Sequence, residues 1–232
     1  PIRLDMHQLC IAPTWAPLAA AALGVPDLGL SVESVLGGIA EATADFRDQF
    51  YGLKGCVVEG SGVMPARRPN FPPLITTGLI DAAVSRWGNK PTRFAGALFT
   101  APRVDLKRLG RDASLSRWAQ GRLVPKVLLA TQTRVLEAIV DDRGEWIPAV
   151  PVITVVPRRK AMLWHIAAVL LSPVASVWAL REYGGSGLSA SAIKLSAKQT
   201  MLVPTPGPNG KARWDAAAKQ IRRAHRARTD AV

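Results

Sequence analysis

Residues Lys126–Val156, KVLLATQTRVLEAIVDDRGEWIPAVPVITVV, carry the strongest fold signal in this chain. They contain three apolar runs of strand length, at Val127–Ala130, Val135–Val140 and Val152–Val156. Short runs rich in Val, Ile and Leu, bounded by turn residues, are typical of buried strands. The second and third runs are separated by Asp141-Asp142-Arg143-Gly144, where Gly144 can adopt the positive φ of a tight turn. We therefore predict strands at these three places.

Helices are predicted on both sides of this region. Downstream, Ser172-Pro173 combines a side-chain N-cap with a proline at the first helical position, and Gly184-Gly185 ends that helix. Upstream, a helix is predicted from Ser114 to Gln120 with Gly121 as its stop. Residues 31–52 could begin a helix, which Gly37-Gly38 weaken. Strand-rich and helical parts together predict an α+β fold.

The chain is strongly and unevenly basic. It has 232 residues and a formal net charge of +13. Residues 86–134 hold eleven Lys and Arg against two Asp, and residues 207–232 hold seven against two, whereas residues 1–60 hold three against seven acids. A protein surface that contacts the phosphate backbone of a nucleic acid needs such a basic block, a cluster of basic residues within the folded region. A solvated basic face without a partner is the alternative.

Cysteine and histidine give no sign of a metal site or a catalytic cluster. Cys10 and Cys56 are far apart in the sequence and form no C-x-x-C motif, which indicates free thiols in a reducing cytoplasm. His7, His165 and His225 are equally dispersed. His165 lies in an apolar helical run, so we expect a core or lid residue there, not a ligand.

The order of these elements resembles a known family. Strands, a helix reached through Leu-Leu-Ser-Pro, a Gly-rich loop, Ile-Lys-Leu-Ser and Leu-Val-Pro-Thr-Pro follow one another as in the TaqI-like C-terminal specificity half of adenine-specific DNA methyltransferases of restriction-modification systems. Further similar segments are Val35–Thr43, Asp45–Gly52, Pro73–Asp81, Trp87-Gly88 with Arg93-Phe94, Pro125–Arg134, Leu170–Pro173 and Leu202–Pro206. The resemblance implies a strand-rich, bacterial-type DNA target-recognition domain with a packed helical part.

The resemblance does not extend to the methyl-transfer chemistry. The family carries a cofactor loop and an Asn/Asp-Pro-Pro-aromatic tetrad, and Asn70-Phe71-Pro72-Pro73 has these letters in a different order. We therefore expect no catalytic, cofactor-binding or metal residue in this chain, and we read Phe71–Pro73 as a strand-entry turn. S-adenosylmethionine is expected to bind an upstream methyltransferase domain or subunit. We therefore divide this chain into a connector from that domain at 1–34, a DNA target-recognition domain at 35–206 and a basic C-terminal tail at 207–232.

Double-stranded DNA is the partner that the resemblance implies, with no membrane. Arg and Lys neutralise phosphates, and Arg and Gln can also read base edges in the major groove. The candidate DNA-binding residues are Arg67, Arg68, Arg86, Lys90, Arg93, Arg103, Lys107, Arg108, Gln132 and Arg134. The segment Trp214–Arg228 has helical composition with a weak apolar stripe of Trp214, Ala217 and Ile221, which favours a solvated basic helix over a phosphate-binding arm.

Two other classes of function stay open. A standalone enzyme could use the Gly184–Ser191 loop, GGSGLSAS, on a phosphorylated ligand through its backbone amides. A membrane-associated protein could use Ala161–Leu180, twenty residues without a formal charge, as a span. Ser172-Pro173 divides that run, which favours a buried helix pair.

Overall fold

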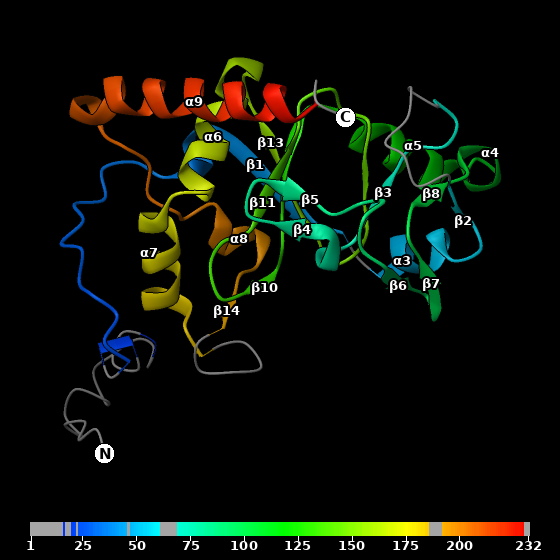
Figure 1. The fold of residues 1–232 in the computed structure, drawn as a ribbon, viewed down its shortest axis with the longest axis horizontal. Coiled ribbons are helices and arrows are strands. Elements are labelled where there is room, and N and C mark those ends of the chain that lie inside the picture. The colour runs from blue at the N-terminus through cyan, green and yellow to red at the C-terminus, as the bar shows by residue number, and fades with distance from the viewer. Residues whose placement is uncertain are drawn as a thin grey trace.

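The computed structural model describes residues 16, 20–21, 23–45, 47–60, 69–185 and 192–229, and these form an α+β fold (Figure 1). At the centre lies a four-stranded sheet in the order β1-β13-β9-β11, with every neighbouring pair antiparallel. Its strands are β1 (Ala40–Ala44), β13 (Ile153–Pro157), β9 (Lys126–Leu129) and β11 (Ala138–Asp141).

Small strand pairs surround this sheet. They are β2 (Val57–Glu59) with β8 (Pro102–Val104), β3 (Leu74–Ile75) with β12 (Ile147–Pro148), β4 (Ile80–Asp81) with β5 (Val84–Ser85), β6 (Thr92–Phe94) with β7 (Ala97–Phe99), and β10 (Gln132–Thr133) with β14 (Ile193–Lys194). Only β3 and β12 run parallel among them. Pro73, at the end of the predicted strand-entry turn, directly precedes β3.

The helices lie on both sides of the central sheet along the long axis (Figure 1). The α-helices are α3 (Arg47–Leu53), α4 (Leu106–Leu109), α5 (Ala113–Arg122), α6 (Leu163–Leu170), α7 (Pro173–Tyr183), α8 (Ala197–Thr200) and α9 (Lys211–Thr229). Short 3-10 turns are η1 (Leu36–Gly38), η2 (Thr77–Leu79), η3 (Lys160–Met162) and η4 (Pro208–Gly210).

All three predicted strands belong to the central sheet, but their arrangement differs from the simplest expectation. The predicted second and third strands correspond to β11 and β13, which are not neighbours because β9 lies between them. The second strand is also shorter than Val135–Val140. The Leu136 amide donates to Ser176 Oγ of α7 at 2.9 Å, so strand pairing begins only at Ala138.

The expectation of a helix within residues 31–52 is wrong for most of that range. Residues Ala40–Ala44 form β1, which pairs with β13 from Ala40↔Pro157 to Ala44↔Ile153. Only Arg47–Leu53, beyond the glycines, is α-helical, and Leu36–Gly38 forms a single 3-10 turn. Pairing along the edge of a buried sheet outweighed a weak helical preference, as tertiary context commonly does.

Strands β9 and β11 of the central sheet are buried on both faces, and the side chains of β9 alternate between two hydrophobic clusters. Val127 and Leu129 of β9 pack with α6 and α7, whereas Leu128 and Ala130 pack on the opposite side with Ile80 and Trp87. Successive strand residues point to opposite faces, so a sheet covered on both sides needs apolar residues at nearly every position. That explains why β9 reads as one continuous apolar run.

The predicted α6–α7 break is confirmed. Ser172 accepts hydrogen bonds from the amides of Val174 and Ala175, Pro173 is the first residue of α7, and the helix ends before Gly184. Within the described residues no single helix is long and apolar enough to cross a membrane; the pair Lys160–Leu170 and Pro173–Tyr183, bent by 67°, meets that test by length and composition alone. Both helices contribute to the buried core of the sheet.

The C-terminal helix α9 is docked and is not a solvated tail. It lies across α6 (Figure 1), where Trp214 Nε1 donates to the His165 carbonyl oxygen at 2.8 Å. His165 Nε2 lies 2.8 Å from Asp215 Oδ1, so this histidine joins two helices. Ala218 is the most fully buried residue of the helix, next to the predicted stripe member Ala217. Trp214 and Ile221 of the predicted stripe pack against the core, so this narrow apolar face fixes α9 to the domain.

One buried ion pair fixes the turn after β11. Lys126 and Asp141 face each other across β9 and β11 and are 0% and 3% exposed, and Lys126 Nζ contacts Asp141 Oδ2. The same carboxylate accepts the amides of Glu145 and Trp146, both at 2.9 Å, and Gly144 has the predicted positive φ, at 71°. Burial lowers the pKa of Lys126, against the raising effect of Asp141.

Removing one charge of this pair should be costly. We expect Asp141→Asn to lower the free energy of unfolding by roughly 3–5 kcal/mol, because it leaves Lys126 buried without its counter-charge. The double variant Lys126→Met with Asp141→Asn should recover part of that loss. Urea denaturation measures both, and Glu41→Gln in the exposed Arg158–Glu41 pair is the control, with about 0–1 kcal/mol expected. A single variant as stable as the control contradicts this role.

The contact between α9 and α6 should depend on pH at the acid end. Hydrogen bonds with His165 and Lys211 hold the pKa of the Asp215 carboxyl below its ordinary value. The stabilisation is therefore present above the ordinary pKa of about 3.9 and is lost as pH falls through the lower folded-state pKa. Asp215→Asn should flatten this acid loss in thermal unfolding measured from about pH 6 downwards. Parallel profiles for the variant and the wild type contradict it.

Candidate nucleic-acid interface

The predicted DNA-binding residues are spread over the molecule and are not gathered into one patch. Most lie in the loop-rich half, by which we mean residues 47–60 and 69–122, whereas Gln132 and Arg134 lie at β10, which pairs with β14. Arg67 and Arg68 lie outside the described residues. The remainder come from the segment between β5 and β6, which holds Arg86 and Lys90, and from the β6–β7 hairpin, β8, α4 and the β10 strand with the residue after it. In Figure 1, β5 lies near the centre, β6 at the lower right and α4 at the far right.

The β4–β5 hairpin carries Arg86 in a mixed-charge setting. Arg86 Nε lies 2.5 Å from Asp81 Oδ2, and both side chains are partly exposed. Burial raises the pKa of the neighbouring Glu137, Asp81 raises it further, and Lys90 acts in the opposite direction. Arg86 is therefore partly neutralised within the protein, whereas Lys90 is exposed.

The β6–β7 hairpin presents an arginine and a leucine side by side to solvent. Arg93 pairs with Leu98 across the hairpin, and both are exposed, Leu98 at 61%. The inner face is fixed by the buried residues Thr92 and Phe94. Ala95 and Gly96 in the turn have positive φ, at 49° and 88°, as the tight two-residue hairpin turn requires. Arg93 thus has a defined position on a short, anchored ribbon.

Arg103 is a correction to the predicted contacts. It is 2% exposed, its guanidinium lies 4.7 Å from the centre of the Trp87 ring, and its Nη1 donates to the Phe71 carbonyl oxygen at 2.6 Å. Trp87 is itself buried and donates from Nε1 to the Pro102 carbonyl oxygen at 2.8 Å. An arginine enclosed in this way positions the β8 region and does not reach a phosphate.

The other predicted residues are reachable from solvent to different degrees. Lys107 and Arg108 are exposed on α4, which Asp105 caps by accepting both of their amides. Arg108 Nε also lies 3.4 Å from the Asp105 carboxylate. Arg134 is exposed, whereas Gln132 is half-buried in register with Lys194.

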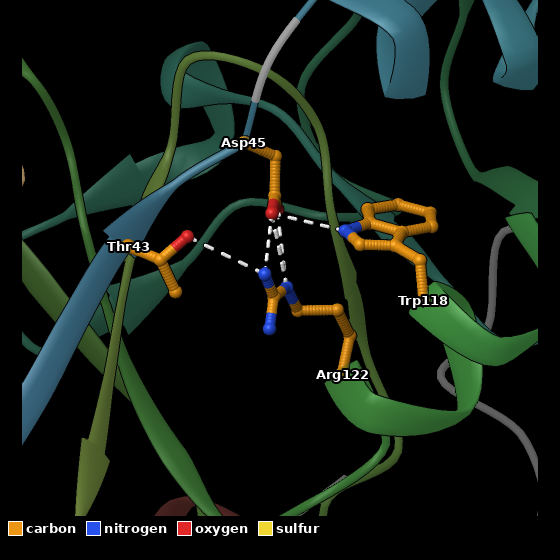
Figure 2. A network of polar contacts seen from close by, with 4 residues as sticks. All are labelled: Thr43, Asp45, Trp118 and Arg122. Atoms are coloured by element: carbon orange, nitrogen blue, oxygen red, sulfur yellow. Dashed lines mark hydrogen bonds and ion pairs between the residues drawn. The ribbon is translucent and has the colours of Figure 1, made fainter. Parts of the chain in front are cut away.

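A polar network that the sequence analysis missed docks α5 against the end of β1 (Figure 2). Asp45, 8% exposed, accepts from Arg122 Nη2 at 2.5 Å and from Trp118 Nε1 at 2.9 Å. Arg122 Nη2 also lies 3.4 Å from Thr43 Oγ1. Arg122 therefore belongs to the basic block by sequence but not to its surface. Asp112 caps α5, and Gly121, the predicted stop, lies inside the helix.

Acid–base and metal chemistry have little basis in the described residues. No three His, Cys, Asp or Glu side chains there are grouped as a metal would need. Burial raises the pKa of the Cys56 thiol, with a further contribution from Asp105, so the thiol is a poor nucleophile near neutral pH. Cys10 and residues 186–191 of the predicted phosphate loop lie outside the described residues. Gly184 and Gly185 are described and end α7.

Comparison with known proteins does not assign this chain to a protein family, so its functional class is argued from the geometry described above. No protein-family model matches the sequence, and a search of characterised proteins gave no match.

The Asp45 network should contribute to stability through its carboxylate. We expect Asp45→Asn to cost roughly 3 kcal/mol, since Arg122 would lose the counter-charge of a largely buried pair. Trp118→Phe removes one hydrogen bond to that carboxylate and should cost about 1.5–3 kcal/mol. Both are measured by urea denaturation. Equal, sub-kilocalorie losses for the two variants contradict a central role for the carboxylate.

Proposed function

We propose that this chain binds duplex DNA as the specificity part of an adenine-specific, S-adenosylmethionine-dependent DNA methyltransferase of a restriction-modification system. The observation that carries the proposal is the excess of exposed cations on the loop-rich half: Lys90, Arg93 and Lys107 are exposed on separate loops and elements. Such a surface neutralises phosphates along a duplex.

The segments that resemble the recognition half of the methyltransferases form neighbouring elements of one folded unit. Pro125–Arg134 forms β9 and continues through β10, Leu170–Pro173 is the α6–α7 break, and Leu202–Pro206 returns to the start of the domain. Val35 there bridges Pro204, and the Leu36 amide donates to the Val203 carbonyl oxygen at 3.0 Å. Segments far apart in sequence thus close one folded unit, which supports the resemblance without assigning a DNA target.

The proposed division of labour follows from the chemistry of adenine methylation. An adenine amine lies inside the base stack, so the enzyme must extrude the base while it grips the flanking phosphates. In this proposal the chain supplies grip and base reading, through Arg86, Lys90, Arg93, Lys107, Arg108, Gln132 and Arg134, with Arg67 and Arg68 as further candidates. An upstream methyltransferase domain or subunit would bind S-adenosylmethionine and perform the transfer, in the cytoplasm and without a membrane.

A salt titration of DNA affinity tests the proposal. We expect the wild-type chain to bind duplex DNA with an affinity that falls steeply with salt, and Lys90→Gln with Arg93→Gln to flatten the log–log slope by about two units, near 0.9 per lost phosphate contact. The control is Lys198→Gln, an exposed lysine of α8, and the changes in slope are compared per charge removed.

The control separates a defined interface from a merely basic protein. Circular dichroism must first show that both variants keep the fold. No binding by the wild type overturns the proposal. An equal loss of slope in the variant and in the control shows diffuse charge attraction and removes Lys90 and Arg93 from the interface.

A further inference from the structure

Helix α9 carries a second concentration of positive charge, separate from the loop-rich half. Its sequence KARWDAAAKQIRRAHRART contains one acid, Asp215. Seven of its residues are exposed cations: Lys211, Arg213, Lys219, Arg222, Arg223, Arg226 and Arg228. Within the described part of the chain, the ion pairs found on this helix are Lys211–Asp215, His165–Asp215 and His225–Asp142. Arg222, Arg223 and Arg226 are not neutralised by any of these.

Both ends of α9 are held in place, so the backbone positions that carry these cations are fixed relative to the domain. Near the start, Trp214 and Asp215 bind His165 of α6. Near the end, the rings of Trp164 and His225 lie 5.2 Å apart, and Arg228 Nη1 donates to the Ala83 carbonyl oxygen at 3.0 Å. A row of cations on a fixed helix loses little backbone freedom when it binds a rigid polyanion.

The far end of α9 adjoins the proposed interface. Ala83 lies in the β4–β5 turn, between Asp81 and Arg86, and it contacts Arg228 directly. The last turns of α9 therefore lie beside the hairpin that carries Arg86. The two basic regions adjoin at this turn, where the contacting residues Ala83 and Arg228 are 145 positions apart in the sequence.

We propose that the outer face of α9, centred on Arg222, Arg223 and Arg226, binds the phosphate backbone of duplex DNA beside the β4–β5 hairpin. The inference rests on the proposed function. It adds a second contact, the α9 clamp, which binds the phosphate backbone and does not depend on the DNA sequence. Arg222 and Arg226 are four residues apart, and Lys219 and Arg223 likewise, so like charges adjoin along the helix and repel one another. Phosphates placed between them relieve that repulsion.

The residues on the outer face favour DNA over a lipid surface. A helix that lies in a membrane interface turns large apolar side chains towards the lipid. In α9 Trp214 and Ile221 pack against the core instead, and the exposed positions between the cations are Ala212, Ala216, Gln220, Ala224 and Ala227. The helix dipole accounts only for cations in the last turn, Arg226 and Arg228, and not for Arg222 or Arg223.

The test uses the complete chain with a mixed-sequence duplex, titrated between about 50 and about 200 mM salt. We expect Arg222→Gln with Arg226→Gln to flatten the log–log slope by up to about two units. Gln preserves helical propensity, and both positions are exposed, so thermal unfolding should be unchanged. Lys198→Gln is again the control, with the changes in slope compared per charge removed; Figure 1 shows α9 along the top of the molecule and α8 below it.

The outcomes distinguish this inference from the proposed function. If the α9 variant matches the control while Lys90→Gln with Arg93→Gln still flattens the slope, the α9 clamp is overturned and DNA binding stands. If the wild type binds no duplex, both fail. If it binds vesicles that contain phosphatidylserine but no duplex, both fail and a lipid surface replaces them. A flattened slope for the α9 variant but not for the control supports the clamp.

Discussion

The rest of this fold depends on the paired strands β9 and β11, which are buried on both faces. Such a strand pair leaves almost no place for a charge, yet Lys126 and Asp141 sit opposite each other within it. The Asp141 carboxylate is tolerated because it contacts Lys126 and accepts hydrogen bonds from two backbone amides. These contacts offset the desolvation free energy that burial of the two charges costs. The turn that this carboxylate orders leads to β12, whose pairing with β3 joins the loop-rich half to the sheet.

The Lys and Arg residues of the basic block at 86–134 fall into two groups, enclosed and exposed. Arg103, Arg122 and Lys126 lie in the basic block of the sequence, but each is enclosed and holds neighbouring elements together. Lys90, Arg93 and Lys107 lie in the same block and are exposed. Charge composition alone therefore overstates the surface that is available to a polyanion, and burial decides which cations remain.

The features predicted correctly from sequence are those that depend on residues close together in the chain. The apolar runs identified β9, β11 and β13, Ser172-Pro173 identified the start of α7, and the Asp-Asp-Arg-Gly turn identified the positive φ of Gly144. The sequence did not predict β1, since residues 40–44 become a strand only by pairing with β13. Nor could it predict that Arg103 stacks on Trp87 or that Arg122 meets Asp45, because these contacts join residues brought together only by the fold. The docked face of α9 was underestimated for the same reason, since its partners lie on α6.

The order of α6 and α9 along the chain has a consequence for biosynthesis. Helix α6 is translated before α9, so its residues Trp164 and His165 meet their respective partners His225 and Trp214 only when α9 has emerged. Until then a nascent chain exposes an aromatic surface beside an otherwise complete core, the kind of surface that chaperones recognise and that leads to aggregation. Helix α9 is thus the last of the described elements to be made, and its docking covers this aromatic surface.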